Sequence, residues 1–158
     1  MEVPAMTLSD LSTEQVKKEI PEVEEKVKIC RLSDSVPDVQ PGSRANTKLV
    51  GPDISKETEI VYQRFAPNHM GVYHMHRHAE NIWLVIQGEL EAIIGGVRYF
   101  VREGEMIFMP SGVPHATGNR GEVDMLAVEI YAPPTEHFEP RDAYPAELPE
   151  HIEDAPRT

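Results

Sequence analysis

Cysteine is almost missing from this chain of 158 residues, in which Cys30 is the only one. A single cysteine cannot form a disulfide within the chain, which excludes the disulfide-stapled scaffolds of small secreted proteins. Free cysteines are typical of a reducing compartment, so we expect a cytoplasmic protein. Cys30 itself is interpreted as a small apolar packing residue and not as a reactive thiol.

Long apolar runs and an excess of basic residues are missing too. No run of about twenty apolar residues is present, so a transmembrane helix is excluded. The N-terminus, MEVPAMTLSDLS, lacks the basic start and the apolar stretch of a secretory signal. Lys and Arg number 15 against 27 Asp and Glu, which gives a formal net charge of −12. This charge disfavours nucleic acid and anionic membranes as partners.

The composition divides the chain into three parts. Residues 1–45 are polar and acidic, and a capping-box pattern at Ser12 predicts a short helical arm. Residues 46–132 contain the strand-like segments and form the single expected domain. Residues 133–158 are so dense in proline that a central strand or a long helix is excluded there.

Short segments rich in apolar and β-branched residues, separated by turns, fill residues 46–132. Gly95-Gly96 lies between two of them and is a strong hairpin signal, because two-residue primed turns need positive φ angles. Strands at this spacing, with no long helix among them, indicate an all-β antiparallel sandwich or barrel. The expected strands are Glu59–Ala66, Ile82–Ile86, Glu89–Ile94, Val97–Val101, Met106–Met109 and Val123–Tyr131.

Histidines stand at alternate positions in the segment HMHRHAENIWLVIQG, at His74, His76 and His78. Side chains alternate between the two faces of a strand, so His74 and His76 can point to the same side and share one metal ion. Imidazole suits iron, zinc, copper and nickel. A further histidine, His115, follows a Gly/Pro turn on a separate segment, which favours a folded metal site over a local cluster.

These two segments resemble the two motifs of the cupin superfamily. The second motif is Gly, five residues, Pro, one residue, Gly, two residues, His, three residues, Asn. The chain matches every fixed position of it, at Gly104, Pro110, Gly112, His115 and Asn119. In the first motif, His-x-His and the closing glycine are matched by His74, His76 and Gly88. The resemblance covers roughly residues 58–132.

The resemblance implies a double-stranded β-helix, or jelly-roll barrel, that holds one divalent transition metal ion through His74, His76 and His115. The fourth ligand stays open, because the motif's glutamate position is occupied by Asn81, while Glu80 lies one residue early. A one-residue shift changes which face of a strand points inward. We favour an inward Asn81, with Glu80 as the alternative ligand and the three histidines alone as a third arrangement.

With Asn81 inward, Trp83 and Val85 follow it into the barrel; with Glu80 inward, Ile82, Leu84 and Ile86 do. If Glu80 is not a ligand, it is the candidate catalytic proton acceptor. Arg64 is a candidate for binding a carboxylate substrate, and a surface arginine on an edge strand is the alternative interpretation of it.

The favoured function is a metal-dependent enzyme acting on a small oxygenated or carboxylated molecule, with iron and dioxygen chemistry first. Three neutral imidazoles with at most an amide leave the ion's charge uncompensated, so an anionic substrate can bind beside open positions for dioxygen. Zinc or nickel in the same site would favour lyase, decarboxylase or isomerase chemistry instead, and manganese is also compatible with these ligands.

Two further expectations concern partners. A non-catalytic ligand-binding cupin is the other class of function, but its usual sensor form carries a DNA-binding helix-turn-helix, and residues 1–45 are too acidic for one. The segment Ile82–Ile86 is apolar on both faces, and one barrel buries only one of them. We therefore expect a homodimer.

Overall fold

The computed structural model describes residues 27–34 and 38–156 and is built almost entirely of strands. The predicted helix at Ser12 lies outside the described residues. Two single 3-10 turns, η2 (Leu32–Asp34) and η3 (Thr135–His137), flank the barrel in the sequence. The strands are β1 (Arg44–Val50), β2 (Glu59–Phe65), β3 (His69–Met70), β4 (His74–Met75), β5 (Glu80–Gln87), β6 (Glu89–Ile94), β7 (Val97–Arg102), β8 (Met106–Met109), β9 (His115–Asn119), β10 (Met125–Ala132), β11 (Tyr144–Pro145) and β12 (Glu153–Asp154).

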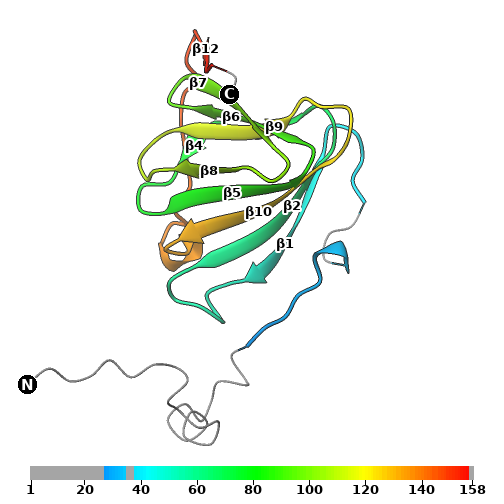
Figure 1. Ribbon diagram of the computed structural model, residues 1–158. Helices are drawn as coiled ribbons and strands as arrows, with labels where there is room; N and C mark the ends of the chain where they lie inside the picture. The colour runs from blue at the N-terminus through cyan, green and yellow to red at the C-terminus, as the bar shows by residue number, and fades with distance from the viewer. Residues whose placement is uncertain (1–26, 35–37, 157–158) are drawn as a thin grey trace, which may run out of the picture.

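These strands form two sheets that face each other, as Figure 1 shows. One sheet has the order β1-β2-β10-β5-β8, and the other has the order β11-β4-β9-β6-β7-β12, with β3 paired to β9. Apart from the consecutive pairs β1-β2 and β6-β7, neighbours in each sheet are not consecutive in sequence, because the chain crosses repeatedly between the sheets. This is the all-β double-stranded β-helix that the motifs imply, and the fold prediction is confirmed.

Alternation along β5 decides which side chains enter the barrel. Asn81, Trp83 and Val85 are buried, whereas Leu84 and Ile86 on the opposite face are 40% and 37% exposed. Trp83 packs against Phe65 of β2 with ring centroids 5.6 Å apart. Truncating such a buried aromatic residue to alanine costs about 3–5 kcal/mol, so this face of β5 is fixed by packing.

The remaining core residues come from both sheets and fill the space between them. They include Leu90 and Ala92 of β6, Val101 of β7, Met109 of β8, and Met125 and Ala127 of β10. The interior also holds buried polar residues, among them His76, His115 and Glu129. Trp83 belongs to the core and also lines a cavity beside these residues.

The predicted hairpin is present between β6 and β7. These strands pair in antiparallel register from Glu89↔Arg102 to Ile94↔Val97. Gly95 and Gly96 in the turn have φ angles of 56° and 85°, which residues with a Cβ adopt only at a cost. All six predicted strands are found within one to two residues of their expected ends, the usual uncertainty of strand boundaries. The sequence patterns did not indicate β1 or β9.

The proline-rich segment after β10 lies against the barrel. Its strand β11 pairs with β4, and β12 runs parallel to β7. Ile152 packs on Tyr73, Ile93 and Ala116, whereas Leu148 is 54% exposed. Both strands have only two residues, as expected where prolines remove backbone donors. Among the described residues, no helix is long and apolar enough to span a membrane.

Candidate metal centre

Three histidines from the two motifs come together in one cluster. His74 on β4 lies directly opposite His115 on β9 in the antiparallel register. His76 follows β4, and its carbonyl oxygen accepts a hydrogen bond of 2.6 Å from the backbone N–H of Gly112. Gly112 has a φ of 76°, so the turn before His115 depends on a residue without a Cβ. Backbone hydrogen bonding thus joins the two motif segments, and both segments contribute histidines to the cluster.

Each of these imidazoles has its Nδ1 atom against a backbone carbonyl. The distances are 2.7 Å from His74 to Val72, 2.5 Å from His76 to Asp142, and 3.0 Å from His115 to Val113. A carbonyl oxygen can only accept a hydrogen bond, so each Nδ1 must carry the proton. In the neutral ring, this places the lone pair of each histidine on Nε2, the tautomer that binds a metal.

The ring nitrogens of the three histidines face a common point. One ligand atom from each ring lies within 4.8 Å of the others. The Nε2 atoms of His74 and His76 are 3.2 Å apart, although in these tautomers neither carries a hydrogen. Two opposed lone pairs at that distance repel, and a cation between them relieves the repulsion. The donor set therefore fits a transition metal ion, which takes neutral imidazole ligands.

Burial keeps His76 and His115 in the neutral, ligating form. Burial lowers the pKa of the His115 imidazole to about 4, and the neighbouring His74 and His76 lower it further. Burial also lowers the pKa of His76, which the hydrogen bond to the Asp142 carbonyl partly opposes. Desolvation disfavours the charged imidazolium. The lone pairs of these two rings are thus free of protons at neutral pH.

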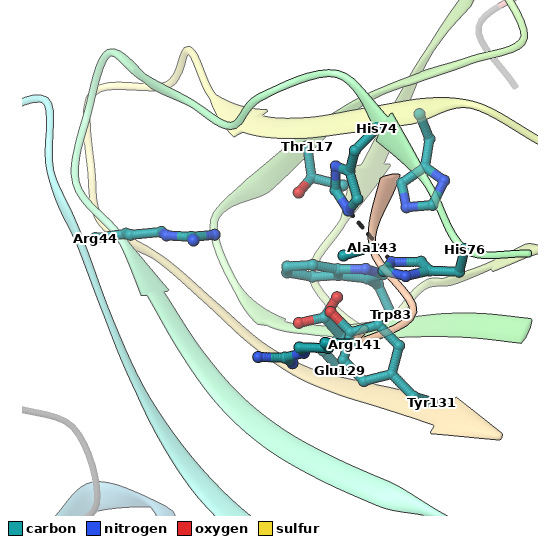
Figure 2. Close-up of a pocket in the computed structure, with 10 residues that line it drawn as sticks. Arg44, His74, His76, Trp83, Thr117, Glu129, Tyr131, Arg141 and Ala143 are labelled. Atoms are coloured by element: carbon teal, nitrogen blue, oxygen red, sulfur yellow. Dashed lines mark hydrogen bonds between the residues drawn. The ribbon is translucent and has the colours of Figure 1, made fainter. Parts of the chain in front are cut away.

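The histidines line a cavity of about 210 Å³ between the two sheets. Figure 2 shows its side chains, with Trp83 and Tyr131 forming the wall beside the rings and Glu129 pointing inward. Cavities for drug-sized ligands measure roughly 300–1,000 Å³, so this one suits a small molecule. The full lining is Arg44, His74, His76, Trp83, His115, Thr117, Glu129, Tyr131, Arg141 and Ala143.

Asn81, the residue at the motif's glutamate position, points inward but has both amide atoms engaged. Its Oδ1 accepts a hydrogen bond of 2.6 Å from the indole N–H of Trp83, and its Nδ2 donates to Glu129 at 3.1 Å. Asn81 does not line the cavity. The amide oxygen proposed as fourth ligand is therefore turned to the indole, and we leave Asn81 out of the ligand set.

Glu80, the predicted proton acceptor, starts β5 on its outer face and is exposed. The structure does not bring Glu80 to the histidines, because adjacent residues of a strand point to opposite faces. The inward carboxylate is Glu129 of β10 instead, which lies opposite Trp83 in the register and is 4% exposed.

Glu129 is a buried carboxyl group with three side-chain donors. Gln63 donates to it at 2.6 Å, and Asn81 and Tyr131 also hydrogen-bond to it. Burial raises the pKa of Glu129, and these donors oppose the increase. Burial likewise raises the pKa of the Tyr131 hydroxyl well above its ordinary value. A carboxyl group with a raised pKa beside a cavity is a candidate for proton transfer.

Two arginines give the cavity a positive rim. Arg44 reaches inward from the start of β1 (Figure 2). Arg141 comes from the segment after β10, where its Nε donates to Thr135 at 2.9 Å. Arg64, the arginine selected from the sequence, does not line the cavity and forms ion pairs of 2.7 Å with Asp124 and 2.9 Å with Asp38. Arg64 therefore lies outside the cavity, but β2 is an inner strand of its sheet and not the edge strand of the alternative interpretation.

The other described histidines lie away from the cluster. His78 stacks on Phe138 with ring centroids 4.3 Å apart, and His69 lies edge-on to Phe65. His137 and His151 are exposed. His78 has the same parity as the ligands, but the chain turns after His76 and carries it out of the strand geometry.

Several cavity residues had no local sequence signal. Glu129 and Tyr131 are inward because they lie on the same buried face of β10 as Ala127. This pattern becomes informative only when β10 is paired with β5. Arg44 and Arg141 lie outside the predicted barrel segment, and long-range pairing brings them to the rim.

Comparisons with known proteins agree with this geometry. Residues 61–131 match the family described as "Cupin domain". The chain therefore contains a cupin domain, and its buried three-histidine cluster is consistent with a metal-binding member of that family. No curated protein matches the sequence.

Solved structures with the same fold include proteins with different roles. A conserved Klebsiella pneumoniae protein with a double-stranded β-helix domain has a TM-score of 0.64 at 21% identity, with 77% of this chain and 98% of that one covered. The polyketide cyclase RemF from Streptomyces resistomycificus has a TM-score of 0.60 at 22% identity, with 78% and 88% covered. An oxalate oxidase in complex with glycolate has a TM-score of 0.58 at 24% identity, with 67% and 59% covered. At these identities the similarity concerns the fold alone.

Proposed function

We propose that this protein is a metal-dependent enzyme that converts a small, anionic, oxygenated or carboxylated molecule. The observation that supports it most directly is the convergence of the three Nε2 atoms of His74, His76 and His115, each with its Nδ1 proton held by a backbone carbonyl. Histidines that serve only packing have no reason to share one tautomer and one focal point.

The ligand set we propose is three neutral imidazoles. None of them compensates the charge of a divalent ion, and three ligands leave coordination positions open, as catalytic metal sites require. When bound, the ion would supply a Lewis-acid or redox centre facing the cavity. A site of this charge favours an anionic substrate group.

Arg44 also favours an anionic substrate. Its guanidinium points inward (Figure 2), and within the described part of the chain it forms no ion pair, in contrast to Arg64. A guanidinium binds a carboxylate through two parallel hydrogen bonds. We propose that Arg44 holds the carboxylate of the substrate and so orients its reacting end toward the histidines.

Glu129 is the residue we propose for proton transfer, in place of Glu80. It lines the cavity with the histidines, its pKa is raised by burial, and Gln63 and Asn81 fix its two oxygens. Trp83 and Tyr131 lie beside it in the cavity wall (Figure 2). Glu129 would accept a proton from the bound substrate and return it to the product at the same oxygen.

For the reaction class, we propose iron and dioxygen chemistry first, because the open, low-charge ligand set has room for both an anionic substrate and dioxygen. Metal-dependent isomerisation, elimination or decarboxylation is the second candidate, and it is favoured by Glu129, since these reactions need a proton acceptor. Proteins of this fold include an oxalate oxidase and a polyketide cyclase.

The test is reconstitution of metal-free protein under anaerobic conditions with iron(II), zinc, manganese or nickel. A panel of small carboxylates, catechols and diketones is then followed for product and for oxygen uptake. Oxygen-dependent turnover that peaks with iron supports the oxygenase proposal. Turnover without oxygen, or with a zinc optimum, overturns it in favour of the second candidate.

A matched pair of variants tests the proton-transfer role in the same assay. Glu129→Gln keeps the shape of the side chain and should reduce turnover by roughly 10²- to 10⁴-fold, the usual contribution of general acid–base catalysis. Glu80→Gln should leave turnover unchanged. Saturable binding of a panel compound with no turnover by any metal form would contradict the enzyme proposal and identify a ligand-binding cupin.

A further inference from the structure

Asp142 is a fully buried acidic residue in the proline-rich segment, between η3 and β11. Its carboxylate accepts three backbone hydrogen bonds from the loop that follows His76. The N–H groups of Arg77, His78 and Ala79 donate to it at 2.7, 3.0 and 2.9 Å. One side chain of the C-terminal segment therefore ties down the whole loop between β4 and β5.

The same residue also contacts the metal-site histidine itself. The main-chain carbonyl of Asp142 accepts the hydrogen bond from His76 Nδ1 at 2.5 Å. His74 and His115 use the carbonyls of Val72 and Val113, each two residues earlier in the chain. The partner of His76 lies 66 residues away. Of the three histidines, His76 is thus the one whose tautomer depends on the C-terminal segment.

Other contacts fix the carbonyl of Asp142 in place. Its N–H donates to the carbonyl of Thr135 at 3.0 Å. Thr135 is held by the buried carboxylate of Glu59, which accepts from its N–H at 3.1 Å and its hydroxyl at 2.9 Å. The segment is therefore anchored to β2 on one side and to the loop after His76 on the other.

We propose that Asp142 is a positioning residue of the metal centre: its carboxylate anchors the segment whose carbonyl orients His76. The C-terminal segment is then part of the site and not an appendage of the barrel. This inference rests on the proposed metal binding. A partner of this kind holds the ring in its ligating orientation and tautomer.

The experiment compares Asp142→Ala and Asp142→Asn with Asp154→Ala. Asp154 is an acidic residue of the same segment whose carboxylate pairs with Arg98 of β7. In metal-free protein, ¹⁵N NMR of the imidazoles reports the tautomer of each histidine. We expect a single Nδ1–H form of His76 in wild type and in Asp154→Ala, and a mixture of both tautomers in Asp142→Ala.

The second measurement is cobalt(II) affinity by chelator competition at a temperature where all variants are folded by circular dichroism. Asp142→Ala should weaken cobalt binding by roughly 10- to 100-fold, the range for partners of metal-ligating histidines. Asp142→Asn should give a smaller loss, because its oxygen can still accept from the loop. If Asp142→Ala does not fold, Asp142→Asn carries both measurements.

A double-mutant cycle separates positioning from general stability. In a His76→Ala background, Asp142→Ala should change cobalt affinity no further, because the histidine it positions is gone. Equal losses in both backgrounds, or an unchanged His76 tautomer and affinity in Asp142→Ala, overturn the inference. If wild-type protein binds no cobalt, the proposed function fails, while the tautomer measurement still tests the link between Asp142 and His76.

Discussion

The indole N–H of Trp83 donates to the side-chain oxygen of Asn81, two residues earlier on the same face of β5, at 2.6 Å. This contact engages the amide oxygen at the position where the cupin motif has a glutamate. The amide nitrogen of Asn81 in turn donates to Glu129. Asn81 thus links Trp83 in the cavity wall to the buried carboxylate of Glu129 through two hydrogen bonds.

Replacing Asn81 tests this arrangement. Asn81→Ala should keep the metal content of wild type but lower the free energy of unfolding by about 1–3 kcal/mol, because the Trp83 indole loses its acceptor. Metal content is measured by elemental analysis and stability by urea denaturation. Glu80→Ala, at the exposed neighbouring position, is the control and should change neither. Loss of the ion in Asn81→Ala would show that its amide oxygen is a ligand after all.

The charge on Arg44 should determine which small molecules enter the cavity. Arg44→Met should weaken the binding of succinate to the zinc-loaded protein by about 10-fold or more, since hydrogen bonds to charged groups contribute about 1.5–3 kcal/mol. Succinamide, the uncharged analogue, should be unaffected. Isothermal titration calorimetry measures both ligands, with Arg64→Met as the matched control on the outer face. Equal losses for both ligands would argue against a carboxylate-binding role.

Protonation of His115 should make the metal-free protein less stable in mild acid. The pKa of this imidazole is about 4 in the folded chain and near 6.5 in an unfolded one. Between these values the unfolded chain binds the extra proton, so stability falls as the pH drops from 6.5 toward 4 and levels off below that. The maximum slope from one such group is about 1.4 kcal/mol per pH unit.

Urea denaturation at several pH values from 7 to 5, with chelator present, measures this slope. His115→Gln should flatten it relative to wild type, and His137→Gln, at an exposed position, should not. A His115→Gln profile parallel to that of wild type would contradict the neutral, buried state of this ring.

The outer face of the sheet with β5 supports the expected homodimer, which we retain as a proposal. Leu84 lies opposite Met106 and Ile82 lies opposite Phe108, and Met106 and Phe108 are 56% and 48% exposed. On a chain of net charge −12, this apolar surface is where two copies can approach with little repulsion. A contiguous exposed apolar face of this kind is typical of an interface.

Light scattering measures the oligomeric state directly. We expect a mass near twice 17.8 kDa, and Met106→Glu should shift the protein toward the monomer. Ile54→Glu, at another exposed apolar residue, should leave the mass unchanged. A monomer mass for wild type across a hundredfold concentration range would exclude the dimer.

Much of the fold was predictable from the sequence, because its signals are local. Gly95-Gly96 defines the hairpin, alternation along β5 makes Trp83 inward, and the spacing of His74, His76 and His115 follows two motifs. The residues that complete the site depend on long-range pairing. Glu129 becomes recognisable only when β10 pairs with β5, and Asp142 only when the C-terminal segment folds back onto the loop after His76.

Asn81, at the position of the expected fourth ligand, shows the same limit: the sequence predicted its place but not its role. The motif placed Asn81 on the inward face, and burial agrees with that register. Its role, however, depends on which neighbours compete for its amide, and the hydrogen bond from Trp83 cannot be deduced from motif spacing. Sequence parity identifies the face of a strand, whereas the partners across the barrel determine what a side chain on that face does.

The metal content of purified protein tests the central claim most directly. After expression in metal-supplemented medium, elemental analysis should give close to one transition metal ion per chain. His115→Ala should remove that ion, and His78→Ala, at the histidine stacked on Phe138, should retain it. Wild-type protein without metal, and without cobalt or zinc binding on titration, would contradict the account.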